Sequence, residues 1–308
     1  MRNPDGIGVV RSATVPSETI ELPFQVDVVA ATRGSKAVRS GGRLPPGAWW
    51  ATETPDGPGT LHLDGRGHHV RAEAWGPGAA WLLRQAPRLL GAEDDPDSFR
   101  PGDGPLSALA RGKVVRFGRS DRVFEALLPT ILGQKVQTKA AYESLRRIVA
   151  AHGEPAPGPV SLRMFPTAER VATLGYADFH RHNVERKRAA TIIEAARRAS
   201  RLEEIVDLST EDAWRRLQAV RGIGPWSAAL VMAAACGDAD AVPVGDYHIP
   251  HSVAWVLAGE PRGTDERMLE LLEPYRGHRM RVIRLIKSSG QRAPRYGPKL
   301  SIIDFTAR

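Results

Sequence analysis

The sequence predicts an α+β protein, with a small antiparallel-sheet domain over residues 1–108 and an all-α domain with an irregular C-terminal tail over residues 109–308. Three observations support this prediction. Apolar and polar residues alternate at period two up to residue 75, which is typical of half-buried strands. A segment rich in Asp, Pro and Gly follows at 93–104 and suits a linker, and beyond residue 120 apolar residues recur at helical spacing.

Turn residues separate the strand-like segments of the N-terminal domain. The alternating runs lie at 19–22, 60–63 and 70–75. Clusters of Asp, Gly and Pro at 56–59 and 64–67 predict hairpin loops. Residues 79–90 have a short helical pattern despite Pro87, so a small sheet with one helix is expected.

The second half predicts a series of helices joined by short connections. Ser120 is placed to cap the first of them, and Pro129 is expected to kink or split it. Further helices are expected at 167–174, 186–200, 210–219, 225–236, 246–258 and 265–287. The tail, residues 292–308, has no periodic pattern.

Composition and charge narrow the class of protein. The chain has 308 residues, 42% of them hydrophobic, which is enough to bury a substantial core. A net charge of +8 and a pI near 10.0 favour a polyanionic partner, nucleic acid first among them. Arg is abundant along the whole chain, however, so a compositional bias also accounts for the charge.

Cysteine usage and hydropathy exclude several classes of protein. The single Cys236 excludes an internal disulfide and a four-cysteine zinc or iron–sulfur site, and its Ala-rich surroundings predict a buried small side chain. No apolar run has the roughly 18 residues that a membrane span needs, and the sequence shows no signal-peptide pattern. A monomeric cytoplasmic protein, associated with the nucleoid, is therefore expected.

The most informative run is 217–229, where one apolar helix ends and another begins within a few residues. Gly222 and Gly224 permit positive φ and close approach, and Ile223 can fill the space between the helices. Pro225 suits the first helical turn, so the second helix begins with unpaired N–H groups that can bind a DNA phosphate. The alternative is an ordinary helical hairpin, because Gly-x-Gly between helices needs no ligand.

Asp246 lies in a Gly-Asp-Tyr run, after a short apolar extended segment and before an apolar helix. An Asp at the start of a helix caps it and stabilises it by about 1 kcal/mol over Ala. A carboxylate at this position can also take part in catalysis. The two roles are compatible.

Together these features resemble the helix-hairpin-helix DNA glycosylase superfamily, in particular the 3-methyladenine DNA glycosylase II family, over residues 110–290. Three segments carry the resemblance: a Gln-containing segment at 131–134, the hairpin at 222–228 and the Asp loop at 243–247. The β-rich N-terminal part is similar in position and character to the small α/β domain of that family. The resemblance implies a base excision repair enzyme that flips an alkylated purine, such as 3-methyladenine, out of damaged double-stranded DNA and hydrolyses its N-glycosidic bond.

The resemblance also implies roles for individual residues. Asp246 becomes the catalytic carboxylate, which stabilises positive charge on the sugar and orients the attacking water. Relatives that use a Schiff-base amine have a Lys in the hairpin where this chain has Trp226, so a monofunctional enzyme is implied. Trp226 and Tyr247 match aromatic positions of the family and are candidates for the base pocket, with core packing as the alternative. DNA-backbone contacts are assigned to Gly222, Ile223, Gly224 and Ser227, and intercalation or DNA contact to Gln134 and Lys135.

Lys135 departs from the pattern, because many relatives have an apolar wedge there, whereas a Lys contacts a phosphate or a base edge. A glycosylase for a different lesion therefore stays open, as does a noncatalytic DNA-binding module that retains the hairpin. His248 and His251 have the spacing of metal ligands, but DNA contact or packing is favoured since no third ligand is evident. No redox cofactor or catalytic metal is expected, and the family implies at most a structural monovalent cation at the hairpin.

Overall fold

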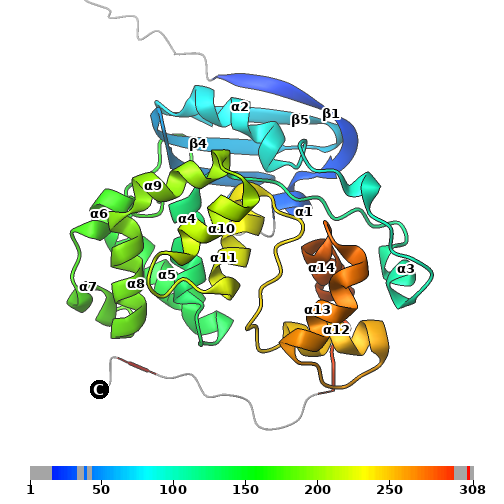
Figure 1. Cartoon of the computed structure of the whole chain (residues 1–308). Helices are drawn as coiled ribbons and strands as arrows, with labels where there is room; N and C mark the ends of the chain where they lie inside the picture. Colours follow the sequence, from blue (N-terminus) through cyan, green and yellow to red (C-terminus); the bar gives the residue numbers. More distant parts are fainter. Residues whose placement is uncertain (1–15, 33–37, 40–43, 295–303, 306–308) are drawn as a thin grey trace, which may run out of the picture.

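The computed structural model describes residues 16–32, 38–39, 44–294 and 304–305. A β-sheet with its helix α2 lies on one side of the molecule, and the helices of the second half lie against the sheet (Figure 1). Most of the predicted irregular tail and residues 1–15 of the predicted N-terminal domain fall outside the described residues. No helix among the described residues has the length and apolar character to cross a membrane.

The sheet has five antiparallel strands in the order β1-β5-β4-β3-β2. They are β1 (Ser17–Asp27), β2 (Val38–Arg39), β3 (Ala48–Thr54), β4 (Gly57–Asp64) and β5 (Arg66–Trp75). Both predicted hairpins form, with loops tighter than expected because the Gly and Pro residues at 57–59 already pair with β3. Helix α1 (Val28–Thr32) follows β1, and α2 (Ala79–Leu89) packs on β1, β4 and β5, close to its predicted bounds.

The rest of the described chain is helical, which confirms the α+β prediction. Its helices are α3 (Pro105–Ala110), α4 (Val123–Leu132), α5 (Thr138–His152), α6 (Ala168–Ala172), α7 (Tyr176–His180), α8 (Arg186–Arg197), α9 (Ala199–Glu203), α10 (Thr210–Gln218), α11 (Pro225–Val231), α12 (Ile249–Ala258), α13 (Asp265–Leu272) and α14 (Arg279–Ser289). Short 3₁₀ turns lie at Pro96–Ser98, Glu204–Asp207 and Glu273–Tyr275, and a π-helical turn at Met232–Cys236 continues α11.

Helix predictions were wrong in their bounds at the start of α4, at 265–287, and at 246–258, where α12 begins at Ile249. Ser120 does not cap α4, which starts three residues later because the Glu203 carboxylate accepts its first two backbone N–H groups at 2.8 and 2.9 Å. The helix then runs through Pro129, and the chain turns after it at 133–137. The single helix expected at 265–287 is two helices, since Pro274 lacks an N–H and Gly277 has φ of +89°.

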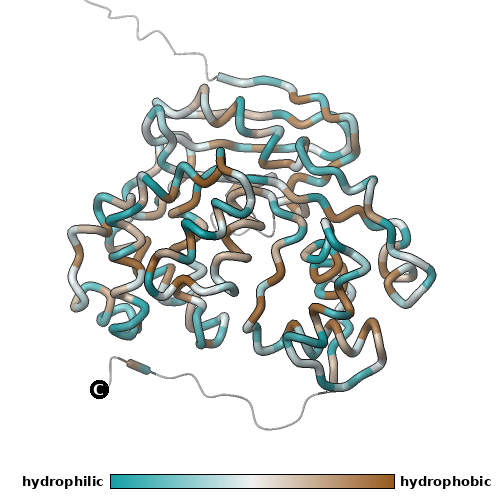
Figure 2. The backbone as a smooth tube through the Cα atoms, in the orientation of Figure 1, coloured by the Kyte–Doolittle hydropathy of each residue, from teal (hydrophilic) through white to brown (hydrophobic). Residues whose placement is uncertain are grey.

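Two clusters of buried hydrophobic side chains form the core. One lies between the sheet and α2, and the other runs through the helical half, where apolar and polar residues alternate along the helices (Figure 2). Cys236 is half-buried in the second cluster, and burial raises the pKa of its thiol to about 12. The predicted linker at 93–104 is fixed to α14, because Asp94 forms a 2.7 Å ion pair with Arg281, whose side chain is 2% exposed. The domain boundary at residue 108 stays a prediction.

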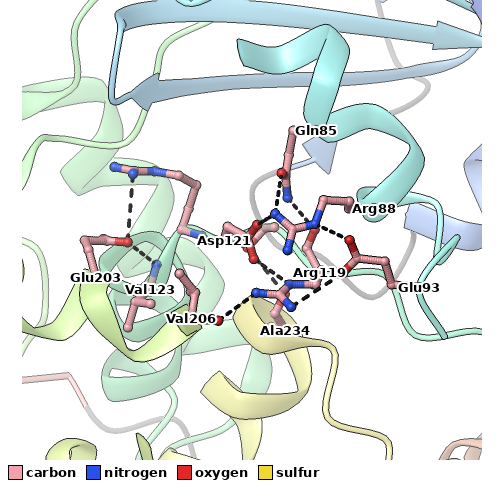
Figure 3. A network of polar contacts seen from close by, with 11 residues as sticks. Gln85, Arg88, Glu93, Arg119, Asp121, Val123, Glu203, Val206 and Ala234 are labelled. Atoms are coloured by element: carbon pink, nitrogen blue, oxygen red, sulfur yellow. Dashed lines mark hydrogen bonds and ion pairs between the residues drawn. The ribbon is translucent and has the colours of Figure 1, made fainter. Parts of the chain in front are cut away.

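A polar network joins α2 to the helical half close to α11 (Figure 3). Asp121 accepts from Arg88 at 2.5 Å and from Arg119 at 2.6 Å, so it bridges α2 and the segment before α4. Its backbone N–H donates to the carbonyl of Ala235 at 3.0 Å, in the π-helical turn after α11. Gln85 on α2 adds a bond to the carbonyl of Arg119. The N-terminal sheet is thus tied to the far end of the helix that begins at the predicted hairpin.

Candidate active site

The predicted hairpin, residues 219–224, joins α10 to α11. Gly222 has φ of +95°, and a Cβ there would stand 2.2 Å from Oγ1 of Thr191 on α8, so only glycine fits. Ile223 is 3% exposed and packs in the helical core, as the sequence predicted. Gly224 has an ordinary φ of −96°, with no atom within 4 Å of where a Cβ would lie. One side of the hairpin, at Gly222, therefore packs on α8, while the start of α11 faces open space.

Gln134 ties the turn after α4 to this hairpin. Its side-chain amide nitrogen donates to the Gly222 carbonyl at 2.8 Å and to Ser227 Oγ at 2.9 Å. Ser227 as a whole residue is 2% exposed, so its contact with the DNA backbone stays a prediction. Lys135 follows with its side chain exposed and a left-handed φ of +54°, a conformation uncommon for a residue other than glycine. The turn thus brings Lys135 to the outer edge of the hairpin.

Asp246 lies two residues before the N-cap of α12 and accepts three hydrogen bonds. Its Oδ1 accepts from the backbone N–H groups of His248 at 2.8 Å and Ile249 at 2.9 Å. The N-cap residue is His248, so the predicted N-cap position of Asp246 was wrong, and α12 begins three residues later than predicted. Asp246 still binds the backbone N–H groups at the start of the helix. Oδ2 accepts from Nε1 of Trp226 at 2.9 Å. Gly245 just before it has φ of +91° and donates its N–H to Asp265, which holds the loop against the start of α13.

The two aromatic candidates are placed differently. Trp226 is half-buried at the start of α11, and its hydrogen bond joins the hairpin side of the site to Asp246. Tyr247 is 70% exposed, and its ring meets the edge of His248 with the ring centroids 4.9 Å apart. The structure therefore brings Trp226 and Asp246 together and leaves Tyr247 at the surface beside them. The role of Tyr247 in a base pocket stays a prediction.

The two histidines near Asp246 make packing contacts. His251 accepts the backbone N–H of Gly263 on Nδ1 at 3.2 Å, and its ring lies 6.1 Å from that of Tyr247. His248 is exposed. Within the part of the chain that the structure describes, no three His, Cys, Asp or Glu side chains gather as a metal ion requires.

A separate hollow of about 350 Å³ lies between the end of β3 and helices α4, α6 and α9. Its charged lining residues are Glu53, Arg122, Glu125, Glu169 and Glu203. Glu125 accepts from Nε1 of Trp50 at 2.8 Å, and burial raises the pKa of Glu125 to about 7. The sequence analysis missed this group, because an acid in the first turn of a helix is ordinary and its partner is 75 residues away.

Comparison with known proteins identifies the family. Residues 128–276, which include the hairpin and Asp246, match the family model described as HhH-GPD superfamily base excision DNA repair protein. Over these residues the chain belongs to the HhH-GPD superfamily. The sequence is 29% identical over 160 residues to a DNA-3-methyladenine glycosylase of Bacillus subtilis. The aligned residues are 50% of this chain and 52% of that protein.

One further relative and one solved structure are also similar to this chain. The probable bifunctional transcriptional activator/DNA repair enzyme AlkA of Mycobacterium tuberculosis is 29% identical over 256 residues, which is 76% of this chain and 50% of that protein. The chain thus spans about half the length of the curated relatives it matches. The solved structure of the 3-methyladenine DNA-glycosylase from Archaeoglobus fulgidus has the same fold, with a TM-score of 0.74 at 21% identity over 87% of this chain and 96% of that one.

Proposed function

We propose that the protein is a monofunctional DNA glycosylase of base excision repair, which hydrolyses the N-glycosidic bond of alkylated purines such as 3-methyladenine after base flipping. The observation that carries this proposal is the placement of Asp246. Its carboxylate stands half-buried beside the hairpin, held by three hydrogen-bond donors. The names of the relatives support the choice of alkylated bases.

The carboxylate suits the charge that develops in this reaction. When an N-glycosidic bond breaks, positive charge builds up on the sugar, and a fixed anion beneath C1′ stabilises that state without reorganising. The same carboxylate can orient the attacking water. An alkylated purine is a good leaving group because it already carries a positive charge, so a strong general acid is not required.

The hairpin supplies the contact with DNA in this proposal. The open start of α11 offers backbone N–H groups to a phosphate, and Gly222, Ile223 and Gly224 form the turn that exposes them. Exposed cations lie on the hairpin and on the elements that touch it: Arg221, Lys135 and Lys187. Positive side chains around a helix start favour the backbone of damaged double-stranded DNA as the partner. The proposal implies a monomer that works at the nucleoid.

The chemistry proposed needs neither a redox cofactor nor a catalytic metal. A structural monovalent cation would be held by backbone carbonyls of the hairpin, which are the hard oxygen donors such an ion prefers. The carbonyls of Val220 and Gly222 each accept one hydrogen bond, from Ile223 and Gln134, and each retains a second lone pair. The residues therefore fit such an ion, whose charge would favour a phosphate near the hairpin.

The position of Lys135 favours one second candidate, a glycosylase for another lesion. An exposed Lys at the edge of the hairpin interacts with base edges and phosphates and does not stack in the duplex as an apolar side chain does. The side chain that fills the gap left by the flipped base affects which distortions of the duplex the enzyme tolerates. A Lys in that place would therefore change its range of lesions.

Product analysis tests the proposed function. Native protein is incubated with methylated duplex DNA and, separately, with duplexes that contain one deaminated or one oxidised purine. We expect free 3-methyladenine and 7-methylguanine, and strands that stay intact until alkali cleaves the abasic site. Release from the deaminated or oxidised duplex alone would establish the second candidate. Strand cleavage without alkali would contradict a monofunctional enzyme, and DNA binding without any base release would leave only the noncatalytic module.

A further inference from the structure

The hydrogen bonds of Asp246 distinguish its two oxygens. Oδ1 accepts two backbone N–H groups that open α12, which uses both of its lone pairs. Oδ2 accepts one bond, from the indole N–H of Trp226, and keeps one lone pair among the contacts of the described residues. The carboxylate therefore presents its remaining acceptor position on Oδ2, and the indole is the side chain that fixes the direction of that oxygen.

Trp226 is itself held by the segments that form the hairpin side of the site. It stands two residues after Gly224, in the first turn of α11, so its backbone moves with the hairpin. The far edge of its ring, Cη2, lies 3.7 Å from where a Cβ of Gly133 would stand, at the turn that Gln134 bonds to the hairpin. The ring thus touches the turn after α4 at one end and Asp246 at the other.

We propose that Trp226 is a positioning residue, whose indole N–H orients Oδ2 of Asp246 and thereby couples the seating of the hairpin on DNA to the aim of the carboxylate. This inference rests on the proposed function. It assigns Trp226 a role through Asp246, as an alternative to the base-pocket role that the family resemblance implies. A base-pocket residue would act on the flipped base, whereas a positioning residue acts on the charge at the sugar. Experiments can separate the two roles.

The variant that separates them is Trp226→Phe, which keeps an aromatic ring and removes the N–H donor. The chain offers a matched control, Trp214→Phe on α10, because the side chain of Trp214 interacts with another carboxyl, that of Asp238, outside the site. Benzothienylalanine at position 226 is a second variant. It keeps the size and shape of the indole and lacks the N–H, so it tests the bond even where Trp226→Phe folds poorly.

The measurement compares two abasic duplexes that contain no base to stack on. One has a pyrrolidine at the lesion site, with a positive charge where C1′ would be, and the other has a neutral tetrahydrofuran. We expect native protein to prefer the pyrrolidine duplex, and loss of the indole N–H to weaken pyrrolidine binding about 10- to 100-fold with tetrahydrofuran binding within about 3-fold of native. Single-turnover release of 7-methylguanine should fall by a similar factor, while Trp214→Phe changes none of these values.

The outcomes separate this inference from the proposed function. If native protein releases alkylated bases and prefers the pyrrolidine duplex, but both indole variants retain that preference, Trp226 does not position the carboxylate. A loss of base release with pyrrolidine binding unchanged would likewise overturn the inference, and would establish that Trp226 acts on the flipped base in the base pocket. Native protein that neither releases base nor distinguishes the two duplexes would refute the proposed function, and the inference with it.

Discussion

Replacing Gly222 with Ala should lower the free energy of unfolding by about 1–4.5 kcal/mol, because two costs add at this position and one smaller effect offsets them. The first is backbone strain, since φ is +95° and a left-handed non-glycine residue costs about 1–2 kcal/mol. The second is overlap, since the new Cβ would lie 2.2 Å from Oγ1 and 2.9 Å from Cγ2 of Thr191, a crowding that costs about 1–3 kcal/mol. The reduced freedom of the unfolded chain offsets about 0.4–1 kcal/mol.

Two other glycines separate these costs. Gly277 has φ of +89° with no atom within 4 Å of a Cβ, so Gly277→Ala measures strain alone and should cost about 1 kcal/mol. Gly224 has φ of −96° and equal space, so Gly224→Ala should stay within about 0.5 kcal/mol of native. Urea unfolding followed by circular dichroism gives all three values.

The contact with Thr191 can also be relieved directly. Adding Thr191→Ala to Gly222→Ala removes the two side-chain atoms that lie closer than 3.0 Å to the new Cβ, so part of the lost stability should return. If Gly222→Ala proves no less stable than Gly277→Ala, the hairpin is not seated on α8 as described. The account of how the fold fixes the start of α11 would then be wrong.

Three further predictions concern a buried acid, a buried ion pair and the side chain that ties the turn after α4 to the hairpin. Burial raises the pKa of Glu125 from 4.5 to about 7, so the folded state binds more protons in that window and native stability should fall as pH rises through it. Glu125→Gln removes this pH dependence. In urea unfolding, the free energy of unfolding of the variant should rise relative to that of the native protein by up to about 2–3 kcal/mol between pH 5 and pH 8. The same difference between variant and native protein at both pH values would contradict this prediction. Arg281→Ala leaves the buried Asp94 carboxylate unpaired and should cost about 3–5 kcal/mol, whereas Arg281→Met with Asp94→Asn should cost clearly less. Thermal or urea unfolding of both variants checks this, and equal losses would show that the unpaired charge is not the cause. Gln134→Ala removes both bonds from the turn after α4 to the hairpin and should weaken binding to abasic duplex DNA about 3- to 10-fold; unchanged binding in a fluorescence titration would mean that this tie does not order the hairpin.

The local signals in the sequence predict much of the site. A tight turn into a new helix is predicted by Gly222, Gly224 and Pro225, because each of these residues acts on its own backbone conformation. Asp246 binds the chain just ahead of it for the same reason, since its Oδ1 reaches N–H groups two and three residues ahead, although the N-cap residue itself is His248. Such features depend on neighbours along the chain, so the sequence alone reveals them.

Contacts between distant segments are what the sequence does not show. Glu203 displaces Ser120 at the start of α4 from 80 residues away, and Thr191 makes glycine obligatory at 222 from another helix. The bond from Trp226 to Asp246 spans 20 residues and gives the indole N–H a partner that the sequence does not show. The false single helix at 265–287 is different, because Pro274 and Gly277 are visible in the sequence and predict the break.

The most direct test of the proposed glycosylase is single-turnover release of 3-methyladenine and 7-methylguanine from methylated duplex DNA by native protein and by Asp246→Asn, compared at equal occupancy of the DNA. Asparagine preserves the size of the side chain and an acceptor for the backbone N–H groups of α12, and removes the negative charge. We predict release by the native protein and a loss of at least about 100-fold in the variant, with DNA binding retained. Release by Asp246→Asn at the native rate would contradict the assignment of the catalytic carboxylate.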